Sequence, residues 1–140
     1  MKIVYSYYVL DIIHKGHLLM MKNSKAIAGK DGKLIVGILT EAAVLEKKSK
    51  PPILSLDERI DIADSIKYVD IAVPQETYSP IPNVKKIKPD VLMESASHSD
   101  EDVAEARKVV ESYGGRIIVM PYYPLQSSSD IKKKIKGIHS

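Results

Sequence analysis

Strand-like and helix-like segments alternate along the whole chain, and this alternation is the feature that most restricts its fold. Five short segments are apolar and rich in β-branched or aromatic residues, as buried parallel strands are. They are Lys2–Val9, Lys33–Leu39, Val69–Val73, Asp90–Met93 and Arg116–Met120. Because helical segments separate them, the sequence predicts an α/β fold. We expect a five-stranded parallel, doubly wound (Rossmann-like) sheet with helices on both faces and right-handed crossovers.

The intervening segments carry helix signals. A capping box, Ser55-Leu56-Asp57-Glu58, opens one helix, and the glycine pair Gly114-Gly115 is typical of a helix C-terminus. The expected helices run from His17 to about Ala28, over Glu41–Glu46, from Ser55 to about Lys67, over Asn83–Ile87, from Ser99 to Gly114-Gly115, and onward from a cap in Ser127–Asp130.

Length and composition restrict the class of protein. At 140 residues the chain can bury a core of its own, and we expect a single domain over residues 1–140. The absence of cysteine excludes disulfides and thiolate metal sites, and it suits a cytoplasmic protein. No apolar run approaches the ~20 residues that cross a membrane. The net charge of +3 suits a small anionic substrate and is too small to indicate nucleic acid.

The tetrapeptide His14-Lys15-Gly16-His17 lies between the first predicted strand and the first predicted helix. A helix N-terminus has unpaired N–H donors and a partial positive charge, so it attracts phosphate oxygens. Two histidines three residues apart share one face, where both can donate to the same phosphate, and Gly16 lets a ligand approach the backbone. The motif therefore predicts charge stabilisation in phosphoryl or nucleotidyl transfer. The alternative is a pair of polar surface residues at a helix cap.

Three further groups are candidates for phosphate binding. Lys48, in the basic loop Lys47–Lys50, can neutralise a triphosphate and its pyrophosphate leaving group, or the loop is simply exposed. Arg59 is either a phosphate clamp or an interface residue. The triplet Ser127-Ser128-Ser129 forms a second anion site at a helix N-terminus, or only one serine acts as the cap. We expect the lysine-rich segment Lys132–Lys136 to be a solvated helix face, and we predict no protein metal site.

These motifs resemble those of the cytidylyltransferase-like nucleotidylyltransferases, which include the glycerol-3-phosphate, phosphocholine and phosphoethanolamine cytidylyltransferases. The resemblance covers nearly the whole chain. It rests on Asp11–His17, the Lys48 region, Leu56–Arg59, Val73–Gln75, Lys88–Asp90 and Gln126–Ser129. The stretch from Val69 to Asp90 is most similar to the cytidylyltransferase domains that accompany phosphoenolpyruvate mutase in phosphonate biosynthesis. The chain departs from the family at Tyr7-Tyr8, where a glycine is usual, and at Glu94–His98, where H-G-D-D-W or a similar sequence is usual.

The resemblance implies an enzyme that transfers CMP from CTP to a phosphonate or phosphomonoester, with Mg²⁺ present and pyrophosphate released. An acceptor oxygen would attack the α-phosphate in line, so no covalent enzyme intermediate is needed. The resemblance also assigns the residues. His14 and His17 would stabilise the transition state, Lys48 would hold the phosphates, Asp11, Gly16 and Arg59 would belong to the nucleotide site, and Ser127, Ser128 and Ser129 would bind the β- and γ-phosphates.

Two alternatives stay open. One is an adenylyltransferase of the same superfamily that uses ATP, since base recognition often relies on backbone groups that leave no residue signature. The other is a non-catalytic nucleotide-binding module, suggested by the altered Glu94–His98 segment. Whether the enzyme uses CTP or ATP, we expect a homodimer.

Overall fold

The computed structural model describes residues 1–121 and the backbone of residues 128–139, with side chains in the latter segment for residues 131–136. Its five strands form one all-parallel sheet in the order β3-β2-β1-β4-β5. Their bounds are β1 Ile3–Tyr8, β2 Lys33–Leu39, β3 Ile71–Gln75, β4 Val91–Ser95 and β5 Arg116–Met120. The α/β, doubly wound fold expected from the alternating pattern is confirmed.

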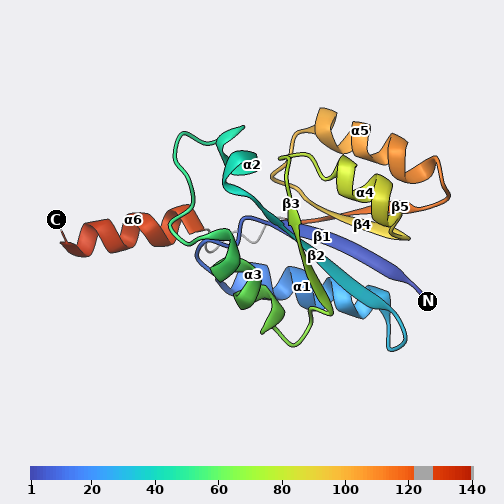
Figure 1. Cartoon of the computed structure of the whole chain (residues 1–140), viewed down its shortest axis with the longest axis horizontal. Coiled ribbons are helices and arrows are strands. Elements are labelled where there is room, and N and C mark those ends of the chain that lie inside the picture. The colour runs from blue at the N-terminus through green and yellow to red at the C-terminus, as the bar shows by residue number, and fades with distance from the viewer. Residues whose placement is uncertain (122–127, 140) are drawn as a thin grey trace.

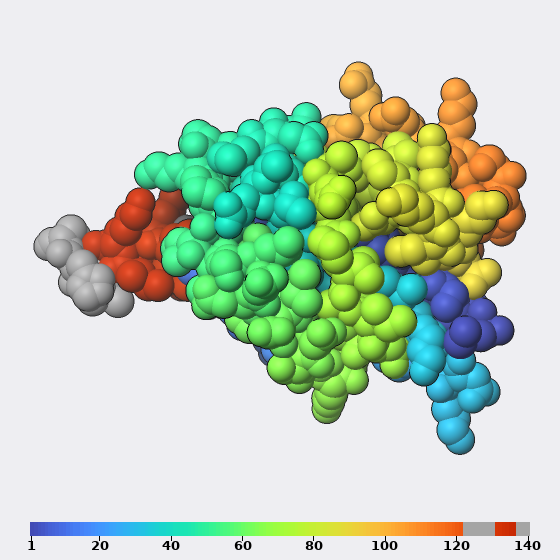
Figure 2. Space-filling model, viewed as in Figure 1, coloured from blue at the N-terminus to red at the C-terminus, as the bar shows by residue number. Residues whose placement is uncertain are grey.

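The helices cover both faces of this sheet (Figure 1). They are α1 Lys15–Ala28, α2 Glu41–Leu45, α3 Leu56–Asp64, α4 Ile81–Ile87, α5 Asp100–Glu111 and α6 Ser128–His139. In Figure 1, α1 and α3 lie below the sheet and α4 and α5 above it, whereas α6 projects away from the body. Figure 2 shows the same projection as an arm at one end of the molecule.

Two apolar clusters hold these layers together. Alternate residues of β1 face opposite sides, as in any strand. Val4 therefore packs with Met21 of α1 and Ala63 of α3, and Tyr5 packs with Val84 of α4 and Ala106 of α5. Each helix pair thus buries its apolar face against one side of the sheet.

Two glycines are needed for this packing. Gly29 ends α1 with φ of 81°, a conformation that glycine adopts without strain. Gly37 of β2 lies against the Tyr5 ring, and a Cβ atom placed there would meet the Tyr5 hydroxyl at 2.0 Å. Glycine at position 37 therefore makes room for a tyrosine inside the sheet.

Several element boundaries differ from the sequence expectations by one to three residues, and two of these differences have a clear cause. The Ser55-capped helix ends at Asp64 rather than near Lys67, and the third strand is Ile71–Gln75 rather than Val69–Val73. The intervening residues turn because the Val69 N–H donates to the Ile66 carbonyl. Asp70 then accepts from the Leu34 N–H and the Lys25 ammonium through Oδ2, which places it just before the strand. Among the described residues, none of the helices is long and apolar enough to span a bilayer.

Candidate active site

The sequence-predicted histidines lie at the topological switch point of the sheet. β1 has β2 on one side and β4 on the other, so the chain leaves the carboxyl ends of β1 and β4 in opposite directions. Doubly wound sheets bind ligands in the crevice that forms at such a point. The β1–α1 turn and the β4–α5 loop both start at this edge.

His14 and His17 form a reciprocal cap at the start of α1. The Gly16 N–H donates to Nδ1 of His14 over 3.0 Å, and the His14 N–H donates to Nδ1 of His17 over 3.2 Å. The two rings lie 4.0 Å apart between centroids, and Tyr8 presents its ring at a right angle to His17, 5.9 Å away. The capping alternative and the shared face are therefore both realised in one arrangement.

The cap fixes which ring nitrogens remain available. Because each Nδ1 accepts a backbone N–H, a neutral ring at either position carries its proton on Nε2, where it is a donor. Burial, and then the charge of His14, lowers the pKa of His17 to about 4. Burial also lowers the pKa of His14. At neutral pH the pair thus offers two neutral N–H donors at the positive end of a helix, which suits an anionic ligand.

Asp11 holds the surroundings of this turn in place. Its buried carboxylate accepts from the backbone N–H groups of Ile53 and Leu54, both over 2.9 Å, and pairs with the Lys132 ammonium of α6 at 2.5 Å. Burial acts to raise the pKa of Asp11, but these donors outweigh it and the pKa lies below its usual value. One carboxylate therefore joins the β1–α1 turn, the loop before α3 and the last helix.

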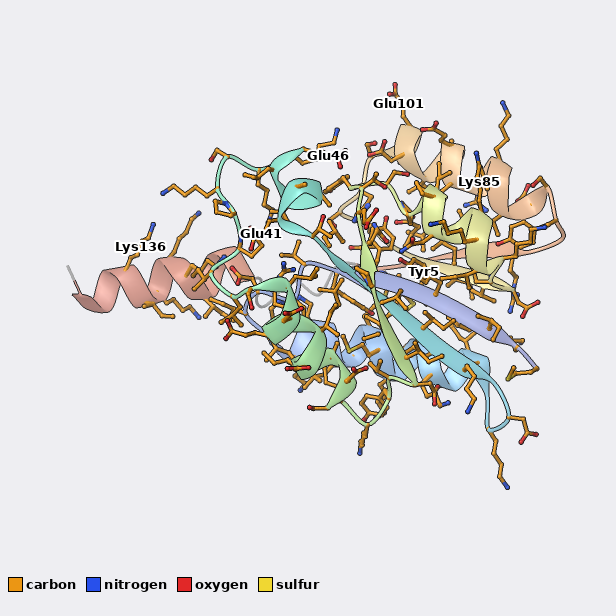
Figure 3. The ribbon with its side chains drawn as sticks, viewed as in Figure 1. Tyr5, Glu41, Glu46, Lys85, Glu101 and Lys136 are labelled. Atoms are coloured by element: carbon orange, nitrogen blue, oxygen red, sulfur yellow. The ribbon has the colours of Figure 1, made fainter. Side chains whose placement is uncertain are left out.

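The pairing of Lys132 changes the interpretation of the lysine-rich segment. We expected a solvated face over Lys132–Lys136, but the Lys132 side chain is only 34% exposed and engages Asp11. The neighbouring lysines are exposed, and Lys136 points outward from the projecting arm in Figure 3. The expectation was therefore wrong for Lys132, because a buried carboxylate from a distant part of the chain lies within its reach.

Arg59 is fully buried, so it is not a surface interface residue in this chain. Its NH1 donates to the carbonyls of Val9 and Leu39 over 2.8 and 2.7 Å, and its Nε donates to Leu54 over 3.1 Å. Val9 and Leu39 lie at the carboxyl ends of β1 and β2. The guanidinium thus fixes the sheet edge on which the site is built, in agreement with an ordering role, and its NH2 has no partner within the described residues.

The remaining sequence candidates are less constrained. Gly16 is the second residue of α1, and its N–H is used by the cap. Lys48 is exposed in the loop after α2, with only its backbone N–H, donated to Val44, in a described contact. Ser127 lies outside the described residues. Ser128 and Ser129 form the first turn of α6, and their side chains lie outside the described part as well.

A second polar cluster, not predicted from the sequence, lies on the other face of the same edge. The Tyr7 hydroxyl donates to Oε2 of Glu94 over 2.7 Å and lies 2.9 Å from Nδ1 of His98. The Tyr78 ring stacks on His98 with centroids 5.8 Å apart. These four residues line a cavity of about 180 Å³. We call them the Tyr7–Glu94 cluster.

The ionisation of this cluster is strongly perturbed. Burial, and then the charge of Asp102, raises the pKa of Glu94 to about 7, although the Tyr7 hydrogen bond acts in the opposite direction. Burial and the Glu94 charge raise the pKa of Tyr7. Burial lowers the pKa of His98. Perturbed groups beside a cavity at a sheet switch point are typical of functional sites.

A buried network positions the Tyr78 wall. The Tyr5 hydroxyl donates to Oε1 of Gln75 over 2.6 Å, and the Gln75 amide donates to the carbonyls of Thr77 and Tyr78. Asn83 donates to the Tyr5 hydroxyl and to the Pro74 carbonyl. The β3–α4 loop is therefore held from inside the sheet, at the Tyr5 position labelled in Figure 3.

One signal in the sequence pointed to the Tyr7–Glu94 cluster. Glu94 continues the apolar run Val91-Leu92-Met93 at the end of the fourth strand, and a charged residue in a buried position is rare unless it has a partner. The partners could not be read from the chain, because Tyr7 and Tyr78 are far from Glu94 in sequence.

Comparison with known proteins places these features in a family. The cytidylyltransferase-like family model matches residues 9–134, which includes the histidine turn, Glu94 and Lys132. A FAD synthase of Korarchaeum cryptofilum is 32% identical over 126 residues, which cover 89% of this chain and 85% of that protein.

Other relatives are larger proteins. The bifunctional protein HldE of Citrifermentans bemidjiense is 30% identical over 135 residues, covering 96% of this chain. The chain spans only 27% of that relative's length. Neither relative is a phosphonate or glycerol-3-phosphate cytidylyltransferase, so the comparisons support the family, and the narrower resemblance stays a prediction.

Solved structures agree on the fold. The lipopolysaccharide core biosynthesis protein of Thermoplasma volcanium superimposes with a TM-score of 0.72 at 24% identity, covering 90% of this chain and 99% of that one. With the family match over residues 9–134, a histidine-capped helix at the switch point and the parallel sheet beneath it, the chain belongs to the cytidylyltransferase-like family of nucleotidyltransferases.

Proposed function

We propose that this chain transfers a nucleotidyl group from a nucleoside triphosphate to an oxygen of a small phosphate-bearing acceptor, with release of pyrophosphate. The observation that carries the proposal is the pair of neutral histidines at the start of α1, whose Nδ1 atoms are both occupied by backbone N–H groups. Their Nε2–H groups are two preorganised donors for the charge that develops on the α-phosphate.

In the proposed reaction an acceptor oxygen forms a bond to the α-phosphorus while the bond to the bridging β-phosphate oxygen breaks. The electron pair of that bond leaves with pyrophosphate. His14 and His17 donate hydrogen bonds and need not give up a proton, which suits neutral rings. Arg59 orders the strand ends, and Asp11 with Lys132 holds the first turns of α6 beside the histidine turn.

The start of α6 supports a role for the serine triplet. Lys132 lies one turn after Ser128, so its pairing with Asp11 brings the N-terminal part of α6 toward the β1–α1 turn. Ser128 and Ser129 would contact the β- and γ-phosphates there through the free N–H groups of the first turn. Lys48, on the exposed loop, would reach the same phosphates when the nucleotide is bound.

ATP is the favoured donor and CTP is the alternative. The FAD synthase relative makes an adenine dinucleotide, and this relationship favours adenylyl transfer over the cytidylyl transfer expected from the sequence. Mg²⁺ would neutralise the triphosphate. The described residues contain no group of three or more His, Asp or Glu side chains placed to hold a metal ion. Mg²⁺ at nucleotide sites is usually held by substrate phosphates and water together with one or two carboxylates.

The test is calorimetric titration with ATP, CTP, GTP and UTP in Mg²⁺, followed by pyrophosphate release with a panel of phosphomonoesters and phosphonates. We expect one nucleotide, ATP first, to bind at least about tenfold more tightly than the others and to support acceptor-dependent pyrophosphate release. A chain that binds no nucleoside triphosphate would refute the proposal. The homodimer stays a prediction, which sedimentation equilibrium tests.

A further inference from the structure

The second polar cluster differs from the histidine turn in its hydrogen-bonding character. A tyrosine hydroxyl has a single proton. The Tyr7 hydroxyl uses that proton to donate a hydrogen bond to Glu94. In the second contact of this hydroxyl, Nδ1 of His98 is therefore the donor and the Tyr7 oxygen is the acceptor. A neutral His98 then carries its proton on Nδ1 and leaves Nε2 as an acceptor. His14 and His17 have the opposite tautomer, with Nε2 as a donor.

Most charged groups around the cavity are also hydrogen-bond acceptors. Four of the lining residues carry carboxyl groups and one is a lysine: Glu46, Glu94, Asp102, Glu105 and Lys47. Glu94 is buried and the other three carboxylates are exposed. Lys47 lies over the Tyr78 ring, 5.7 Å from its centroid. The cavity thus combines a carboxylate floor and rim with an aromatic wall.

We propose that this cavity binds the non-phosphate end of the acceptor, and that it selects a group rich in hydrogen-bond donors, hydroxyl or amine, over one that carries a carboxylate. The proposal rests on the proposed nucleotidyl transfer. The volume of the cavity, about 180 Å³, is below the roughly 300–1,000 Å³ of pockets that hold a whole ligand. The cavity therefore suits one end of a longer molecule. The phosphate end would lie toward the donor-rich histidine turn across the sheet edge.

The groups that line the cavity favour a hydroxyl or an ammonium group over a carboxylate. A hydroxyl or ammonium group can donate to Glu94, to Nε2 of His98 or to the rim carboxylates, and its carbon skeleton can pack on Tyr78. A carboxylate in the same place would meet like charges and would leave the acceptors of the cavity without a donor, so it should bind at least about tenfold more weakly. The side chains need little rearrangement, because Gln75 already holds the Tyr78 loop.

Histidine ring resonances in NMR report the two subsites separately. The chain has four histidines, and single substitutions assign them. His14 and His17 report the nucleotide, and His98 reports the cavity. The probes are glucose 1-phosphate and glucuronic acid 1-phosphate, which differ only in a hydroxymethyl group against a carboxylate, and phosphoethanolamine and phosphoglycolate, which place an amine against a carboxylate.

We expect glucose 1-phosphate or phosphoethanolamine to shift His98 at concentrations at least about tenfold lower than the carboxylate partner requires. The stronger of the two pairs tells whether the hydroxyl or the amine is preferred. Equal or tighter binding of the carboxylate probes overturns the proposal, as does an unmoved His98 resonance with every probe. If neither ATP nor CTP shifts His14 and His17, the proposed nucleotidyl transfer is overturned instead.

Two substitutions separate charge from general damage to the site. Glu94→Gln keeps the shape of the side chain and removes its charge, so the discrimination should fall several-fold. Asp102→Asn, at an exposed rim position, should act in the same direction even if Glu94→Gln folds poorly. The control is Glu101→Gln, which removes one exposed charge from α5 outside the cavity lining (Figure 3). Equal loss of discrimination in the control would contradict a local effect.

Discussion

The buried Glu94 carboxyl makes a quantitative prediction about stability. Glu94 is 2% exposed, and burial with the nearby Asp102 charge raises its pKa from the ordinary 4.5 to about 7. Between these two pH values the folded chain holds a proton at Glu94 that the unfolded chain has lost. The free energy of unfolding therefore falls as pH rises through this window, and the loss is complete above the folded-state pKa.

The size of the effect follows from the difference between the two ionisation constants. At about 1.4 kcal/mol for each tenfold change, a rise from 4.5 to about 7 corresponds to about 3 kcal/mol. This is a large share of the 5–15 kcal/mol that typically stabilises a domain. Glu94→Gln copies the neutral form, so it should remove the pH-dependent loss while keeping an acceptor for the Tyr7 hydroxyl.

The assay is urea unfolding of the wild type and Glu94→Gln at pH 4.5, 6 and 8. We expect the variant to gain about 2–3 kcal/mol relative to the wild type between pH 4.5 and 8. Taking the difference between the two proteins cancels His17, whose lowered pKa makes stability rise between about pH 4 and 6.5 in both. Glu101→Gln should change by less than about 1 kcal/mol over the same range. A Glu94→Gln difference that does not vary with pH would refute the reasoning.

Three further outcomes follow from the site geometry. His17→Ala should lower kcat for pyrophosphate release by about 10²-fold or more, at a stability cost of about 1 kcal/mol for the lost cap; near-wild-type turnover would contradict a transition-state role. Lys132→Met should speed amide hydrogen exchange in α6 and weaken triphosphate binding, whereas Lys136→Met, on the exposed arm in Figure 3, should do neither. Arg59→Met should lower the urea-derived free energy of unfolding by at least about 3 kcal/mol, because three carbonyl acceptors lose their donor, and an unchanged midpoint would argue against an ordering role.

The fold was predictable because its determinants are local. The second and fifth strands, Lys33–Leu39 and Arg116–Met120, have the predicted bounds in the structure, since each is a continuous apolar run between turn signals. The third strand was displaced by two residues because its start depends on Asp70, which contacts Leu34 and Lys25 from other elements. Contacts of this kind leave no periodic signal.

The site was predictable only in part, for a related reason. The histidine turn is a contiguous motif, so its position after β1 and its shared face could be deduced from spacing alone. The Asp11–Lys132 pair joins residues 121 positions apart, and the Tyr7–Glu94 contact joins residues 87 apart. Sequence reasoning placed Asp11 at this edge, but it expected Lys132 to be solvated, and it noted Tyr7 and Glu94 only as departures from the family pattern.

The residues that violate local rules of stability are concentrated at the switch point. Glu94 lies in the buried strand β4 at a cost that grows above pH 4.5, and His17 is held neutral at a cost that grows as pH falls below 6.5. A core built for stability alone would have an apolar residue in place of Glu94. Such violations are expected where function opposes stability. Near neutrality His17 is neutral at almost no cost in stability, whereas most of the cost of burying Glu94 has already been incurred. Under the proposed function, the histidine turn would bind the phosphate of an acceptor and the cavity would bind its donor groups.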